Sequence, residues 1–103
     1  MTKLESKFEE ELKNWVEYNG GLTLKLPAIY YAGIPDRLVL YNGKIAFIEL
    51  KRNGHYPRLL QEMWIRRLTN LGFLAFWMNY ETFITKYKPN GIESLWLPRG
   101  ASE

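Results

Sequence analysis

The sequence predicts an α/β domain in which a mixed β-sheet is flanked by helices. Apolar residues recur at helical spacing over residues 4–16 and again over residues 60–71, which favours two amphipathic helices. Residues 42–43 carry a strong β-hairpin signal, and residues 73–78 form an apolar run of strand length. The expected order of elements is therefore α-β-β-β-α-β, followed by a short C-terminal extension.

The first helix is expected to begin near Thr2, which matches a capping-box pattern with Glu5, and to end at Asn19-Gly20-Gly21. Residues 22–26 alternate between apolar and polar side chains and therefore predict a short strand. Residues 27–35 are expected to form a loop that leads into the hairpin.

The hairpin joins residues 35–41 to residues 44–51 through Asn42-Gly43, a pair typical of a two-residue type I′ turn. This turn pairs Tyr41 with Lys44, and the same register continues outward along both strands. Both faces of the hairpin are mostly apolar, so we expect it to be central in the sheet and covered on both sides.

Pro57 suits the first turn of a second helix that runs to about Leu71, with Gly72 as its cap. Residues 73–78 predict a strand, residues 81–87 a short helix and residues 94–97 an edge strand. A chain of 103 residues has room for one hydrophobic core. We therefore expect a single domain over residues 1–98 and a frayed tail over residues 99–103.

The most informative feature of the chain lies at the open end of the hairpin. The register places Asp36, the only aspartate, directly opposite Glu49, on the face that also carries Lys51. Two opposed carboxylates destabilise a hairpin by about 0.2–1 kcal/mol, so a third group is needed to stabilise them. A divalent cation with a lysine beside it fits that role. A surface ion pair of Lys51 with Asp36 or Glu49 is the alternative.

A glutamine falls inside the apolar arc of the second predicted helix. A buried amide must find hydrogen-bond partners. Gln61 is therefore either a core residue bonded to the backbone or a side chain aimed into a cleft beside Lys51. The apolar residues of the arc are Leu60, Trp64, Ile65, Leu68 and Leu71.

The first helix offers three consecutive glutamates as a further acidic group. Helical phase places Glu9 and Glu11 on the two edges of the apolar arc and Glu10 toward solvent. Only a glutamate at an edge can both leave the solvated face and reach a site on the sheet. An ordinary solvated charge run is the alternative for all three, and the capping position already accounts for Glu5.

Composition limits the chemistry of such a site. The chain has no cysteine and one histidine, which excludes disulfides, thiolate metal sites and zinc sites built on several imidazoles. The remaining ligands are oxygens, which favour Mg²⁺ or Mn²⁺. The net charge is −1 over residues 1–50 and +4 over residues 51–103, which favours a polyanionic partner. With no signal peptide or membrane-length apolar run, we expect a cytoplasmic protein without a membrane partner.

Together these residues resemble the VRR-NUC family, a compact branch of the PD-(D/E)xK nuclease superfamily. The resemblance covers roughly residues 8–78 and implies a restriction-endonuclease-like αβββαβ core. Its short motifs gain specificity from their order, with a hairpin between the proline-aspartate and Glu-x-Lys motifs and a glutamine downstream. The matching segments are Gly20-Gly21 with Lys25, Gly33 to Leu40, Phe47 to Lys51, Gln61, Leu68 and Gly72-Phe73.

The resemblance implies a metal-dependent nuclease that hydrolyses phosphodiester bonds and needs no nucleotide cofactor. Asp36, Glu49 and the backbone carbonyl of Leu50 would hold Mg²⁺ or Mn²⁺. The family's glutamate on the first helix stands three residues before an apolar position, as Glu9 stands before Leu12. Glu9 would therefore complete the outer shell or the shell of a second metal.

The other expected roles concern the attacking water and the substrate. Lys51 would position or help deprotonate the water and counter charge in the transition state, and Gln61 would orient Lys51 or a ligand water. His55, in the loop after the catalytic strand, is expected to contact DNA or to have no special role. The candidates for phosphate contact are Lys25, Arg37, Arg52, Arg58, Arg66 and Arg67.

A chain this small has little surface for gripping a duplex, because specific protein–DNA interfaces bury on the order of 1,000–2,500 Å². We therefore expect a symmetric homodimer whose paired sites suit branched or four-way junction DNA. The expected interface is the second helix or the extension around Trp96. Two alternatives stay open: a nuclease-fold module that binds nucleic acid but is inactive alone, and a basic protein-interaction domain, which would leave the acidic cluster unexplained.

Overall fold

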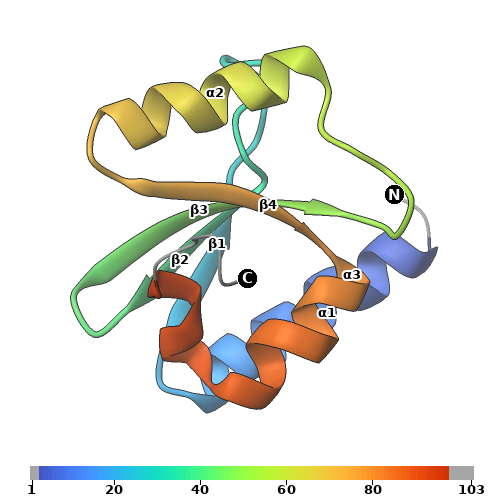
Figure 1. The fold of residues 1–103 in the computed structure, drawn as a ribbon, viewed down its shortest axis with the longest axis vertical. Helices are drawn as coiled ribbons and strands as arrows, with labels where there is room; N and C mark the ends of the chain where they lie inside the picture. Colours follow the sequence, from blue (N-terminus) through green and yellow to red (C-terminus); the bar gives the residue numbers. More distant parts are fainter. Residues whose placement is uncertain (1–2, 98–103) are drawn as a thin grey trace.

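The computed structural model describes residues 3–97, which form a four-stranded mixed sheet flanked by helices (Figure 1). The strand order is β1-β2-β3-β4, with antiparallel pairing between the first three strands and parallel pairing between β3 and β4. The predicted α/β class and element order are confirmed. The strands are β1 (Leu22–Lys25), β2 (Arg37–Tyr41), β3 (Lys44–Lys51) and β4 (Leu74–Asn79). The helical elements are α1 (Lys3–Tyr18), α2 (Leu59–Asn70), α3 (Tyr80–Thr82), the π-helical η1 (Phe83–Tyr87), and the 3₁₀ helices η2 (Lys88–Asn90) and η3 (Ile92–Trp96).

The hairpin between β2 and β3 has the predicted register. Asn42 and Gly43 have φ angles of 49° and 77°, as a type I′ turn requires. Tyr41 pairs with Lys44 at the turn, and Arg37 pairs with Ile48 at the far end of the ladder. Continuing this register by one residue places Asp36 opposite Glu49.

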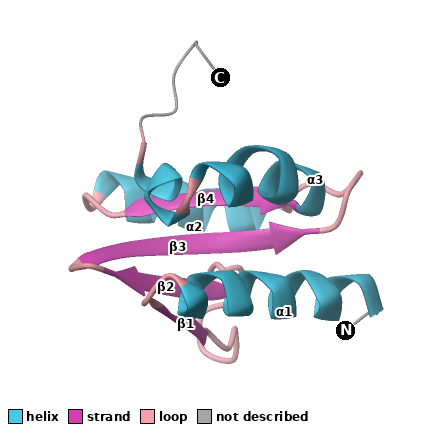
Figure 2. Ribbon diagram, turned by 90° about the horizontal axis from the view of Figure 1, so that it is seen from below, coloured by secondary structure: helices cyan, strands magenta, loops and turns pink. Residues whose placement is uncertain are grey.

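The main core lies between the sheet and one helical layer. α1 and the C-terminal helical segment share one face of the sheet, with α1 packed against β1 and β3 and the C-terminal segment beside β4 (Figure 2). α2 covers part of the opposite face (Figure 1). The largest fully buried side chains include Leu12, Val16, Ile48, Met78, Phe83 and Leu95.

α2 buries a narrower face than its apolar arc predicts. Gln61 and Leu68 are its buried residues, whereas Leu60 and Leu71 are 45% and 65% exposed. Leu60 and Leu71, which belong to the apolar arc of the sequence, therefore lie outside the core. The physical reason is that α2 rests chiefly on β4, at the edge of the sheet, so the strands cover only one line along the helix.

The C-terminal extension is helical throughout its described part. The predicted edge strand over residues 94–97 is wrong, because Ile92–Trp96 form a 3₁₀ helix. Its apolar residues Ile92 and Leu95 are three apart, so both fall on the buried side of a helix with three residues per turn. The predicted frayed tail over residues 99–103 lies outside the described residues.

The loop between β1 and β2 packs closely on the start of α2. Gly33 has a φ of +89°, and a Cβ there would lie 2.8 Å from Cγ of Leu60 and 3.0 Å from its backbone. This close approach ties the segment that precedes Asp36 to α2. Within residues 3–97 no helix is both long and apolar enough to cross a lipid bilayer.

Candidate functional site

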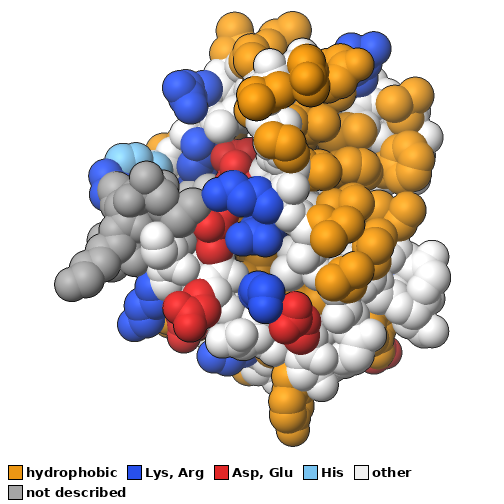
Figure 3. All heavy atoms as spheres, turned by 180° about the vertical axis from the view of Figure 1, so that it is seen from behind, with side chains coloured by type: hydrophobic (Ala, Val, Ile, Leu, Met, Phe, Trp, Pro, Cys, Tyr) orange, Lys and Arg blue, Asp and Glu red, His pale blue; other side chains and the backbone are white. Residues whose placement is uncertain are grey.

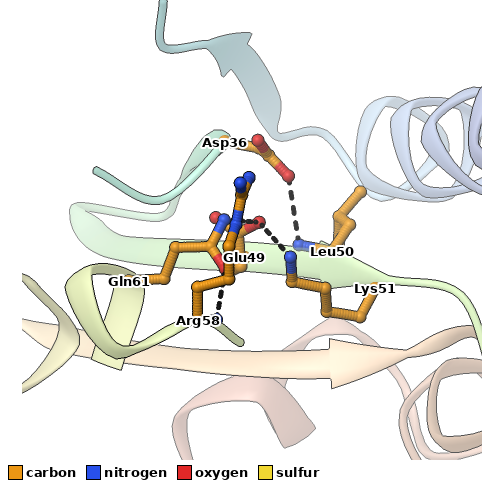
Figure 4. Close-up of polar contacts among 6 residues, drawn as sticks. All are labelled: Asp36, Glu49, Leu50, Lys51, Arg58 and Gln61. Atoms are coloured by element: carbon orange, nitrogen blue, oxygen red, sulfur yellow. Dashed lines mark hydrogen bonds and ion pairs between the residues drawn. The ribbon is translucent and has the colours of Figure 1, made fainter. Parts of the chain in front are cut away.

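The open end of the β2–β3 hairpin brings two carboxylates together. Asp36 stands directly before β2, and Glu49, Leu50 and Lys51 are the last residues of β3 (Figure 4). The backbone N–H of Leu50 donates to Oδ2 of Asp36 at 3.3 Å, which holds the aspartate beside the end of β3. The predicted juxtaposition of Asp36, Glu49 and Lys51 is thus present in the fold.

Glu49 is an electrostatically unusual residue, because it is only 3% exposed. Burial, followed by the neighbouring charge of Asp36, raises the pKa of Glu49 to about 8, although the ammonium of Lys51 acts in the opposite direction. Nζ of Lys51 lies 3.6 Å from Oε2 of Glu49. Oε1 of Glu49 is buried and has no hydrogen-bond partner among the described residues. An unpartnered carboxylate oxygen beside a second carboxylate is a natural ligand for a hard divalent cation.

Gln61 holds Glu49 in place from α2. Its Nε2 donates to Oε2 of Glu49 at 3.2 Å, and its Oε1 accepts a hydrogen bond from the backbone N–H of Arg58 at 2.8 Å (Figure 4). The glutamine is therefore buried and bonded to the backbone, as one of its two interpretations predicts, and it also contacts a carboxylate of the candidate site. Its side-chain hydrogen bonds go to Glu49 and to the backbone at the start of α2, so its geometry orients Glu49 rather than Lys51.

Glu9 reaches the same end of the sheet from α1. It lines a pocket of about 80 Å³ together with residues of β1 and β3 and with Asp36, which precedes β2. The residues around this pocket are Phe8, Glu9, Lys25, Asp36, Leu50, Lys51 and Arg52. The predicted phase of the helix is confirmed, because Glu10 is exposed and Glu11 faces Lys88 on the opposite side, with 4.0 Å between Oε1 and Nζ.

The Glu9 carboxylate is itself paired with two cations. Oε1 of Glu9 lies 3.6 Å from Nζ of Lys25 and 3.5 Å from Nη2 of Arg37. Among residues 3–97 no three His, Cys, Asp or Glu side chains form a cluster that could hold a metal ion. A metal bound here would therefore take its ligands from Asp36, Glu49 and the Leu50 carbonyl, with Glu9 outside that set.

The six basic residues that the sequence offers for phosphate contact lie in different parts of the fold. Lys25 and Arg37 support Glu9, and Arg37 is 9% exposed, so its guanidinium is placed to hold Glu9 rather than to present a surface to phosphate. Arg52 lines the pocket, and the Arg58 side chain points in the direction of Asp36 and Glu49 in Figure 4.

Two basic residues and the histidine lie apart from the two carboxylates of Asp36 and Glu49. Arg66 and Arg67 are exposed in the last turns of α2, and the guanidinium of Arg67 lies 5.3 Å from the centroid of the Trp64 ring. Nε2 of His55 accepts a hydrogen bond from Nε of Arg52 at 3.0 Å. The ion pairs of Glu9 had no signal in the sequence, because they depend on how α1 crosses β1 and β2.

Chemically, this arrangement can bind a hard cation and a phosphate next to each other. Two carboxylates and a backbone carbonyl supply oxygen ligands, and the lysine at the end of β3 supplies positive charge within the same pocket.

Comparisons with known proteins agree with this chemistry. The chain is 41% identical over 69 residues to "Putative nuclease p44" of Acyrthosiphon pisum secondary endosymbiont phage 1, an alignment that covers 66% of this chain and 74% of that protein. It is similar to a solved structure described as "VRR_NUC domain", with a TM-score of 0.72 and 28% sequence identity. That likeness covers 84% of this chain and 99% of the solved one. No protein-family model matches the sequence.

Proposed function

Because this chain belongs to the VRR-NUC family of nucleases, we propose that it is a deoxyribonuclease that uses Mg²⁺ or Mn²⁺ to hydrolyse phosphodiester bonds within DNA. The observation that carries this proposal is the buried Glu49 beside Asp36, with one carboxylate oxygen lacking a hydrogen-bond partner among the described residues. A divalent metal ion would satisfy this pair of carboxylates better than any side chain among the described residues does.

The ligands of the metal would be Asp36, Glu49 and the backbone carbonyl of Leu50. When bound, Mg²⁺ or Mn²⁺ supplies charge neutralisation at the phosphate and lowers the pKa of a bound water. The protein must then hold its two ligand carboxylates at fixed positions relative to the substrate. Asp36 is fixed by the N–H of Leu50, and Glu49 is fixed by the amide of Gln61.

Lys51 supplies the positive charge that the transition state needs. It follows Glu49 by two residues, so both side chains leave β3 on the same face, and its ammonium lies 3.6 Å from the Glu49 carboxylate. From there it can orient the attacking water and neutralise charge that develops on the phosphate. Glu9 acts from outside the ligand set, by pairing with Lys25, which lines the pocket, and with the buried Arg37.

The test is a cleavage assay on linear, flap and four-way junction DNAs with Mg²⁺, Mn²⁺ or EDTA. Cleavage that requires the metal supports the proposal. DNA binding without cleavage under every metal condition would instead favour a nuclease-fold binding module that is inactive alone.

We further propose that the active form is a homodimer that prefers branched DNA. Large apolar side chains gather on one face of the molecule, in the upper part of Figure 3, where Figure 1 places α2 and the loop before β2. Trp96 is less suitable as an interface residue, because its Nε1 donates to the carbonyl of Ile45 at 3.2 Å and its ring stacks on Tyr41. The exposed apolar residues of this face are Ile29, Tyr30, Tyr31, Leu59, Leu60 and Met63.

A further inference from the structure

A second and larger pocket adjoins the candidate active site. Its volume is about 230 Å³, and Phe8 and Arg52 line both this pocket and the smaller one that contains Asp36. Arg52 follows Lys51 directly in the chain, so the two cavities meet at the end of β3. The described residues around the larger pocket are Lys7, Phe8, Arg52, Asn53, His55 and Tyr80.

The charge of this pocket suits an anion. Lys7 and Arg52 are cationic, and none of the described lining residues is acidic. Nε of Arg52 donates to Nε2 of His55 at 3.0 Å, which positions the guanidinium while its remaining N–H groups can serve a ligand. A cavity with this lining does not suit a metal ion, whereas phosphate oxygens match its donors.

Two aromatic residues, Phe8 and Tyr80, also line the pocket and are packed against each other. The Tyr80 ring packs edge-to-face on Phe8, with 5.4 Å between ring centroids, and Nζ of Lys7 lies 6.0 Å from the Tyr80 centroid. The hydrogen bond of its hydroxyl to Glu11 raises the pKa of Tyr80 and anchors the far end of the ring. A ring fixed in this way can accept a nucleobase by stacking, whatever the base.

The loop that carries Arg52 is tied to the helix that carries Tyr80. Oδ1 of Asn53 accepts a hydrogen bond from the backbone N–H of Glu81 at 2.8 Å, which joins the loop after β3 to the helix that begins at Tyr80. This hydrogen bond therefore fixes the position of the loop that carries Arg52 relative to the helix that carries Tyr80.

On these grounds we infer that the larger pocket is a nucleotide subsite, in which the phosphate lies between Lys7 and Arg52 and the base lies against Tyr80. The inference rests on the proposed function, because it places in this pocket the nucleotide next to the phosphate that would be cleaved. Successive phosphates of one DNA strand are only about 3.4 Å apart along the helix axis. A strand with one phosphate at Lys51 must place a neighbouring nucleotide within reach of Arg52.

Binding of a labelled 12-nucleotide single-stranded DNA, measured by fluorescence anisotropy in EDTA, tests the subsite without requiring cleavage. Tyr80→Leu should weaken binding roughly tenfold, the scale of losing one base-stacking platform, while Tyr80→Phe, which keeps the ring, should bind within about twofold of wild type. Lys7→Gln should weaken binding and lower its salt dependence. The matched control is Lys13→Gln on the exposed face of α1, which should bind as wild type does.

A second arm changes the DNA rather than the protein, so it does not depend on the folding of a variant. Scanning a single abasic position through the oligonucleotide should reveal one position that weakens wild-type binding but not binding by Tyr80→Leu. Free dAMP should compete with the oligonucleotide more strongly than deoxyribose 5-phosphate or inorganic phosphate does. Equal competition by all three would overturn the assignment of a base to Tyr80.

The results separate the subsite from the nuclease activity. A protein that binds DNA with these dependences but never cleaves it supports the subsite and contradicts the proposed function. A protein that cleaves DNA, yet shows no loss of binding in Tyr80→Leu and Lys7→Gln, overturns the subsite and leaves the proposed function standing. If wild type fails to bind the DNA in EDTA, the subsite is wrong, and the cleavage assay with Mg²⁺ or Mn²⁺ decides the proposed function separately.

Discussion

Nε2 of Gln61 lies 3.2 Å from Oε2 of Glu49, so a side chain of α2 holds the buried carboxylate at the end of β3. The same amide accepts a hydrogen bond from the N–H of Arg58, which fixes its orientation and leaves its NH₂ group facing the glutamate. This contact occupies Oε2 of Glu49, while Oε1 is buried and has no hydrogen-bond partner among the described residues. It also links the placement of α2 to the geometry of the candidate site.

Replacing Gln61 by alanine should therefore weaken metal binding more than folding. Loss of an outer hydrogen-bond partner of a ligand costs about 10–100-fold in metal affinity or activity. The measurement is a Mn²⁺ titration of the variant and of wild type, with a thermal melt of each metal-free protein beside it. Equal Mn²⁺ affinities would show that Gln61 does not orient a metal ligand.

Asp36→Asn and Lys51→Ala should each reduce the rate of DNA cleavage by at least about a hundredfold, the scale of losing a principal charge-stabilising group. Asp36 is expected to hold the metal, and Lys51 carries the positive charge closest to Glu49. Rates on a DNA that wild type cuts, with and without EDTA, provide the measurement. Two variants that cut as fast as wild type would show that the site is misplaced.

The glutamates of α1 should differ sharply although they are adjacent. Glu9→Gln should lower activity, because the carboxylate lines the pocket and pairs with Lys25 and Arg37. Glu10→Gln is the matched control, since Glu10 is exposed and should tolerate the same change. A silent Glu9→Gln together with an inactive Glu10→Gln would reverse the assignment.

The stability of the metal-free protein should fall as pH rises from about 5 to 8. Burial raises the folded-state pKa of Glu49 from 4.5 to about 8, so in this window the unfolded chain has lost a proton that the folded protein keeps. Raising the pH therefore favours unfolding until both states are ionised. The charge of Asp36 reinforces this effect, whereas the positive charge of Lys51 opposes it.

Thermal melts in EDTA across this pH range measure the effect, and Glu49→Gln should flatten the profile because the amide does not titrate. Mg²⁺ or Mn²⁺ should stabilise wild type increasingly toward pH 8, since the ionised carboxylate is the ligand. A profile that is the same in wild type and Glu49→Gln would contradict the assignment to Glu49.

The assembly should be a dimer formed through the apolar face of α2 and the loop before β2. Sedimentation at micromolar concentration should give twice the 12.2 kDa mass of the chain. Leu59→Glu, on the exposed start of α2, should shift the mass to that of a monomer, whereas Tyr18→Glu, an exposed aromatic position on α1, should not.

The dimer also predicts how a branched substrate is cut. A four-way junction should be cut by wild type at paired positions in opposing strands, and the Leu59→Glu variant should lose this pairing. A wild-type monomer that cuts single-stranded and duplex DNA equally would contradict both the dimer and the preference for branched DNA.

Much of the fold could be predicted because its strongest signals are local. Asn42-Gly43 sets the type of turn, and the alternation of side chains along a strand then sets the register, so the approach of Asp36 to Glu49 follows from residues only 13 apart in the chain. The same alternation places Lys51 with Glu49. These relationships do not depend on how the helices pack.

The errors lie where local patterns are ambiguous. The short segment Ile92–Trp96 suits a strand by its residue types, and only its packing against the core selects a 3₁₀ helix. Leu60 belongs to an apolar arc in the sequence, yet it remains partly exposed because the sheet ends at β4 beneath the helix.

The sequence by itself determined the hairpin, the pairing of its two carboxylates and the face on which its lysine lies, because each depends on backbone geometry over a few neighbouring residues. Only the tertiary structure decided that Gln61 bonds to Glu49, that Glu9 pairs with Lys25 and Arg37, and that Tyr80 closes a second pocket beside Arg52. These contacts join helices to strands that are distant in the chain. Their geometry follows from the angles at which those elements pack, and periodicity along the sequence carries no information about such angles.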